Sequence, residues 1–177
     1  MKKTVLKFGL ISGVFTAVMM AATVPLENKI GFDKAEYLGY TLIVLSFLLV
    51  FFGIRSYREN QGGGEVTFTR AFSVGILITL ITCAFYVATW EALYFTVLHD
   101  FMASYSAHMI EKARASHLSA AAMQAQIDQI NHARDMYENP LYNSAITFLE
   151  PFPVGLAMTL LSAAILRKRP KQVPATA

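Results

Sequence analysis

The chain has 177 residues, of which 55% are hydrophobic and only 15% are charged, with a formal net charge of +3. Soluble domains usually carry about a quarter charged residues, so this composition and the mean hydropathy of +0.44 favour a single membrane domain over residues 1–177. The basic residues do not gather on a soluble face, which argues against nucleic acid as a partner. The single cysteine, Cys83, excludes an internal disulfide and a cysteine-rich zinc site.

Four apolar segments approach the roughly 20 residues that a helix needs to cross the hydrocarbon. We predict an all-α integral membrane protein with four transmembrane helices, over residues 5–25, 37–55, 70–98 and 142–166. The first segment has the basic start of a signal peptide. However, its apolar stretch is long for one and Ala21 to Pro25 matches a cleavage site only weakly, so we interpret it as an uncleaved span.

The loop between the second and third predicted spans, residues 55–65, contains three glycines but lacks the lysine and hydroxyl of a phosphate-binding loop. We interpret it as a turn whose arginines lie at lipid headgroups. The predicted headgroup contacts are Arg55, Arg58, Arg70, Arg167, Lys168 and Arg169. Together with the N-terminal lysines and Lys171, one side then carries ten of the fifteen basic residues. This excess predicts a multi-pass protein of the bacterial cytoplasmic (inner) membrane with both termini cytoplasmic.

The third predicted span carries a polar and aromatic group near its outer end. Tyr86, Trp90 and Tyr94 are spaced four residues apart, so they lie near one helix face, beside Glu91. An aromatic belt at the membrane interface explains these rings without any function. The alternative is an intramembrane polar site.

Residues 100–139 are too polar to enter lipid and too regularly patterned to be a plain loop, so they predict an extracytoplasmic helical hairpin. Its first arm, Met102 to Ala115, can continue the third span outward. Ser119 has the position of an N-cap, and Asn139-Pro140 ends the second arm. The second arm bears an apolar stripe that packs on the first arm or, as the alternative, on a partner: Met123, Ile127, Ile130, Arg134 and Tyr137. The four histidines fall in this segment without a metal-ligand pattern, so no metal site is predicted.

Glu91 and Glu150 are the acidic residues of the third and fourth predicted spans. A carboxylate at mid-membrane is disfavoured by about 3 kcal/mol, and less near the interface. The predicted orientation places both in the outer third of their helices, where they can converge to share a proton or hold a cation. Alternatively, each lies in a wet rim or pairs with a hydroxyl or an arginine of the hairpin.

A candidate helix break follows Glu150, at Pro151, Pro153 and Gly155. Prolines free backbone carbonyls and kink or break a membrane helix, and broken helices mark binding sites in many transporters. The alternative is that the helix starts at one of these prolines, which suit a first turn. That reading leaves a short span of sixteen residues from Pro151 to Leu166.

Several segments together are similar to one known family. They are residues 71–80 with Tyr86 and Trp90-Glu91, residues 137–140, residues 147–156, and the basic residues 167–169. On these motifs the chain resembles the uncharacterised bacterial domain-of-unknown-function 4199 family over nearly its whole length. The resemblance implies a small bacterial integral membrane protein and brings no activity, ligand or catalytic residue with it.

The sequence shows no nucleophile set, cofactor motif or metal-ligand spacing, so no catalytic residue and no cofactor is predicted. The leading hypothesis is a non-enzymatic membrane component whose outer hairpin contacts a protein partner or membrane lipid. A homo-oligomer is compatible with it. The first alternative is a small ion- or proton-coupled transport unit that uses Glu91 and Glu150. The second is a membrane enzyme acting on a lipid-linked substrate, which requires a pocket that opens sideways to lipid.

Overall fold

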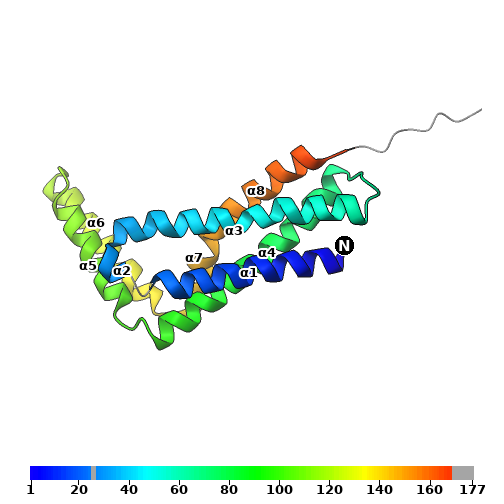
Figure 1. Cartoon of the computed structure of the whole chain (residues 1–177). Helices are drawn as coiled ribbons and strands as arrows, with labels where there is room; N and C mark the ends of the chain where they lie inside the picture. The colour runs from blue at the N-terminus through cyan, green and yellow to red at the C-terminus, as the bar shows by residue number, and fades with distance from the viewer. Residues whose placement is uncertain (25–26, 169–177) are drawn as a thin grey trace, which may run out of the picture.

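A computed structural model describes residues 1–24 and 27–168 of the chain (Figure 1), together with the side chains of residues 1–24 and 29–168. Over this part the protein is all-α, and the extended backbone is limited to an isolated bridge between Val66 and Lys168. The helices are α1 (Lys2–Thr23), α2 (Glu27–Ile30), α3 (Phe32–Asn60), α4 (Phe68–Thr96), α5 (Phe101–Arg114), α6 (Ala120–Tyr137), α7 (Pro140–Leu149) and α8 (Pro151–Leu166).

The described part contains four helical segments that are long and apolar enough to cross a membrane, namely α1, α3, α4 and the pair α7–α8. This confirms the predicted all-α class and the predicted number of spans. The bundle also exposes large apolar side chains on its outside, among them Leu10, Val14, Leu48 and Leu161. A continuous apolar exterior of this kind is suited to lipid rather than water.

Helices α1, α3, α4 and α8 form the bundle, in which α4 packs against the other three and α3 also packs against α1 and α8. Small residues allow the backbones to approach closely, as is common between membrane helices. A Cβ placed on Gly155 of α8 would lie 2.5 Å from Thr79 Cγ2 and 2.7 Å from the ring of Phe47. The Thr79 hydroxyl lies 3.0 Å from that of Thr159, so hydrogen bonding supplements packing at this crossing.

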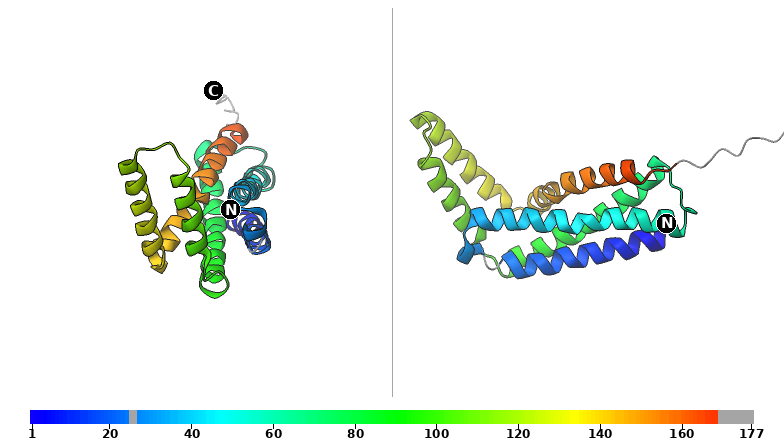
Figure 2. Two further views of the ribbon diagram at one scale, coloured as in Figure 1. Left: turned by 90° about the vertical axis from the view of Figure 1, so that its left-hand side faces the viewer. Right: turned by 45° about the horizontal axis from the view of Figure 1, so that its top comes forward.

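The third span does not continue into the hairpin as a single helix, which departs from the expectation for the first arm. Helix α4 ends at Thr96, the backbone N–H groups of Val97 and Leu98 both bond to the Leu93 carbonyl, and α5 starts afresh at Phe101. This break lets α5 leave the bundle in a new direction. Helices α5 and α6 lie side by side at one end of the molecule (Figures 1 and 2).

Local caps mark the start of α6 and the start of α7, which follows it. The Ser119 hydroxyl accepts a hydrogen bond from the Ala122 N–H and caps α6, while the Asn139 carboxamide caps α7 through the Leu141 N–H. Helix α6 packs against α5. All five stripe residues of α6 are half-buried, and α6 has no fully buried residue: Met123, Ile127, Ile130, Arg134 and Tyr137.

The fourth span is interrupted at Glu150, which ends α7 and precedes α8. One helix therefore starts at Pro151, and another helix directly precedes it. Pro151 and Pro153 have no N–H to donate to the carbonyls of Thr147 and Leu149, four residues earlier. The chain accordingly changes direction between α7 and α8 (Figure 2).

Candidate functional site

A cavity of about 600 Å³ lies at the end of the bundle where α5 and α6 meet it. Pockets that hold small molecules usually measure about 300 to 1,000 Å³. Helices α1, α3 and α4 supply its walls, and α5, α6 and α7 complete it. Its polar and aromatic lining consists of Thr16, Thr23, Phe32, Glu36, Tyr40, Ser46, Tyr86, Trp90, Phe101, Tyr105, Tyr137, Tyr142, Thr147 and Glu150.

The interruption at Glu150 accounts for this space. Helix α8 packs against α3 and α4, whereas α7 packs against α4 and α6. After the change of direction, α7 lies toward α6 and away from α3. The cavity occupies the space between α3 and α7. Tyr40 on α3 and Ile146 and Leu149 on α7 line it and are also exposed, so the cavity is open on the side of the bundle.

A hydrogen-bonded group ties together the helices around the cavity. Trp90 Nε1 donates to the Asn143 carboxamide oxygen at 3.0 Å, and the Thr147 hydroxyl donates to the same oxygen at 3.1 Å. The Asn143 nitrogen donates to the Tyr137 carbonyl at 3.4 Å. Because Trp90 also packs against the rings of Tyr94 and Phe101, this group joins α4 to α5, α6 and α7.

Glu150 and Tyr86, two residues of the predicted intramembrane polar site, meet in the cavity. The Tyr86 hydroxyl donates to Glu150 Oε2 at 2.7 Å. Glu36, near the start of α3, lines the same cavity. In the part of the chain that the structure describes, neither carboxylate forms a salt bridge.

Glu91 does not join this group. Its carboxylate accepts a hydrogen bond of 2.9 Å from the Ser144 hydroxyl of α7, and neither Glu91 nor Tyr94 is among the residues that line the cavity. Glu91 follows Tyr86 by five positions, which places the two side chains about 140° apart around the helix. Glu91 thus pairs with a hydroxyl of α7, outside the hairpin.

Sequence analysis did not single out Glu36 or Asn143. Glu36 precedes the second predicted span and therefore counted as a loop residue. The sequence signal was its spacing of four from Tyr40, which places both side chains on one face of a helix. Asn143, at 0% exposure, is the most deeply buried amide described. A lone amide near the start of an apolar span was the signal in that case, because such a group needs a partner.

The α5–α6 pair is held against the bundle by contacts outside the apolar spans. The Lys112 ammonium donates to the Asp33 carboxylate at 3.0 Å, and this hydrogen bond raises the pKa of Lys112. Phe32 packs edge-on against Phe101 and Tyr105 of α5. Burial raises the pKa of the Tyr137 hydroxyl to about 12. The contacts of Lys112 and Phe32 keep α5, and with it Tyr105, at the cavity.

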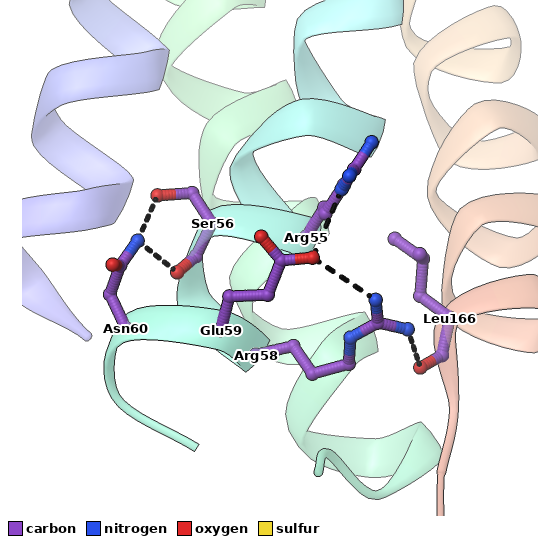
Figure 3. Close-up of polar contacts among 6 residues, drawn as sticks. All are labelled: Arg55, Ser56, Arg58, Glu59, Asn60 and Leu166. Atoms are coloured by element: carbon purple, nitrogen blue, oxygen red, sulfur yellow. Dashed lines mark hydrogen bonds and ion pairs between the residues drawn. The ribbon is translucent and has the colours of Figure 1, made fainter. Parts of the chain in front are cut away.

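The predicted headgroup residues gather at the opposite end of the bundle. Arg58 bonds to the Leu166 carbonyl at the end of α8 and to Glu59, which also pairs with Arg55 (Figure 3). Arg167 and Lys168 are exposed there, and the Lys168 backbone pairs with Val66 beside Arg70. Arg169 lies outside the described residues. Arg58 thus ties the loop after α3 to the end of α8.

Gly155, one of the predicted break residues, lies inside α8 at the crossing with α4. Within residues 1–24 and 27–168, no three His, Cys, Asp or Glu side chains are grouped as a metal site would require.

The motifs that suggested a family extend through this whole arrangement, from the bundle to the interrupted helix. A family model described as "Protein of unknown function (DUF4199)" matches residues 7–168. The chain belongs to the DUF4199 family. No curated protein and no solved structure matches it.

Proposed function

We propose that this DUF4199 protein is a non-enzymatic membrane protein that binds an amphipathic molecule, such as a membrane lipid, in the cavity beneath α5 and α6. The observation that carries the proposal is the cavity itself, which is of ligand size and opens on the side of the bundle between α3 and α7. A lateral opening in a membrane helix bundle faces acyl chains. A ligand can therefore enter from the bilayer without passing through water.

The lining favours an amphipathic ligand. Leu42, Ile43 and Ile146 offer an apolar surface, while Glu36 and Glu150 lie in the same cavity. Phe101 and Tyr105 of α5 and Ala133 and Tyr137 of α6 also line it, so the hairpin would contact the ligand directly. This develops the leading sequence hypothesis, in which the hairpin contacts lipid.

The excess of basic residues around α1, the loop after α3 and the end of α8 supports an orientation with both termini cytoplasmic. The cavity and the α5–α6 hairpin then belong to the extracytoplasmic half of the protein. In a bacterium, this arrangement exposes the cavity to the outer leaflet of the cytoplasmic membrane.

Native mass spectrometry of the detergent-extracted protein tests the proposal. A Cβ on Gly39, which lines the cavity, would meet no atom within 4 Å, so Gly39→Phe places a ring in the cavity without displacing the fold. We expect one amphiphile to remain on the original protein and to be lost in Gly39→Phe. Val14→Phe, on the exposed outside of α1, serves as the control and should retain the ligand. Equal retention in Gly39→Phe and the original protein would refute the proposal.

A transport unit based on Glu91 and Glu150 is the less favoured function, because only Glu150 lines the cavity. Glu91 is engaged with Ser144. Ion uptake into proteoliposomes tests this alternative. If uptake failed equally with Glu91→Gln and with Glu150→Gln, transport would be favoured over simple binding.

A further inference from the structure

We infer that the polar part of the cavity recognises an organic cation, so that the ligand is an amphiphile bearing an ammonium group. This inference rests on the proposed function, because it names the chemical class of the molecule that the cavity binds. Three features of the lining support it: its charge, its aromatic rings and the backbone at the interrupted helix.

The charge of the lining is negative. Glu36 and Glu150 are its charged residues, and no lysine, arginine or histidine of the described chain contributes to it. The Lys112 ammonium is engaged with Asp33. Lys34 lies about 160° around the helix from Glu36. A ligand with an anionic headgroup would therefore meet two carboxylates without a compensating cation, whereas an ammonium group would be attracted by both.

Aromatic rings surround these carboxylates. Tyr40, Tyr86, Trp90, Tyr105 and Tyr137 line the cavity from the four helices α3, α4, α5 and α6. The face of an aromatic ring attracts a cation, and rings grouped in this way are a common means of binding alkylated ammonium groups. A quaternary ammonium cannot donate hydrogen bonds, so rings and carboxylates together suit it better than hydrogen-bond acceptors alone.

The interrupted helix adds electronegative groups to the same wall. Pro151 and Pro153 cannot donate to the carbonyls of Thr147 and Leu149, and both of these residues line the cavity. The Tyr86 hydroxyl bonds to Oε2 of Glu150, which leaves Oε1 of the carboxylate available to a ligand. Ammonium headgroups occur on zwitterionic lipids and on free cationic amphiphiles, and both sources share this chemistry.

Intrinsic fluorescence provides a direct test, because Trp90 is the sole tryptophan of the chain and lines the cavity. Dodecylpyridinium combines a cationic headgroup that quenches tryptophan on contact with an alkyl chain. We expect it to quench Trp90 saturably when added to the full-length protein in dodecyl maltoside micelles. The double variant Glu36→Gln/Glu150→Gln should bind it about tenfold more weakly. Glu91→Gln, which removes a carboxylate of α4 that does not line the cavity, should bind it as the original protein does.

A neutral amphiphile separates this inference from the proposed function. A monoacylglycerol brominated in its chain should quench Trp90 equally in the original protein and in the double variant. If it does so while dodecylpyridinium also binds both proteins equally, the cavity binds amphiphiles and the cation inference is wrong. If neither amphiphile quenches Trp90 saturably, the proposed function fails. Competition of dodecylpyridinium by phosphatidylcholine but not phosphatidylglycerol identifies a lipid headgroup as the source of the ammonium, and competition by hexadecyltrimethylammonium alone identifies a free amphiphile.

Discussion

Replacing Asn143 by alanine should weaken the junction of α4, α6 and α7 on which the cavity depends. The change removes the acceptor of two buried donors, Trp90 Nε1 and the Thr147 hydroxyl, at 3.0 and 3.1 Å. It also removes the bond of the Asn143 nitrogen to the Tyr137 carbonyl. The bonds to Trp90 and Tyr137 join α7 to α4 and α6, whereas the bond from Thr147 lies within α7.

The expected loss of stability follows from these contacts. An unsatisfied buried donor costs about 1 to 3 kcal/mol, and the Thr147 hydroxyl can rotate toward a backbone carbonyl of its own helix, so the Trp90 N–H accounts for most of the cost. The small void left by the missing carboxamide adds about 1 kcal/mol. A single hydrogen bond between membrane helices contributes only about 0.6 kcal/mol on average. Asn143→Ala costs more because it leaves a buried donor without an acceptor and also creates a void. We therefore expect Asn143→Ala to lower the free energy of unfolding by about 2 to 4 kcal/mol.

Unfolding by dodecyl sulfate in dodecyl maltoside micelles, followed by Trp90 emission and circular dichroism, measures this loss. The emission of the folded variant should also shift, because the indole N–H of Trp90 loses its hydrogen-bond acceptor. Asn131→Ala is the matched control, since the Asn131 side chain makes no hydrogen bond within the described chain and lies on α6. A loss below about 0.5 kcal/mol, within the range of ordinary surface substitutions, together with unchanged emission, would refute the assigned network.

Three further changes test other parts of the structure. Gly155→Leu should cost at least about 1 to 3 kcal/mol in the same unfolding assay, because its Cβ alone would lie 2.5 Å from Thr79 Cγ2; stability equal to the original protein would contradict the close crossing of α4 and α8. Pro151→Ala combined with Pro153→Ala restores two backbone donors, so spin labels on α3 and α7 should move closer together, and an unchanged distance would argue against the prolines as the cause of the cavity. The pKa of Tyr137, raised from 10.0 to about 12, makes the protonated hydroxyl stabilising below pH 10, and this contribution should be lost as the pH rises to about 12. Tyr137→Phe should therefore show less alkaline destabilisation over that range, and an identical pH profile would count against the burial of this hydroxyl.

The number and class of the membrane helices could be predicted from the sequence because they depend on local properties. Apolar length decides whether a helix can span a bilayer. Caps such as Ser119 and Asn139, together with the prolines at 140 and 151, mark helix ends through the hydrogen bonds of nearby backbone groups. The stripe of α6 is likewise a local pattern.

The composition of the site depended on the tertiary structure. Glu91 and Glu150 are equally conspicuous in the sequence, yet only Glu150 lines the cavity, because five residues of helix rotate Glu91 away from Tyr86. Glu36, which precedes the second predicted span, enters the site because the start of α3 forms part of the cavity wall. Sequence alone thus determined that the chain has four helical segments long and apolar enough to cross a membrane. The tertiary structure decided which side chains meet, since helix rotation and the direction taken after Glu150 depend on packing between residues far apart in the chain.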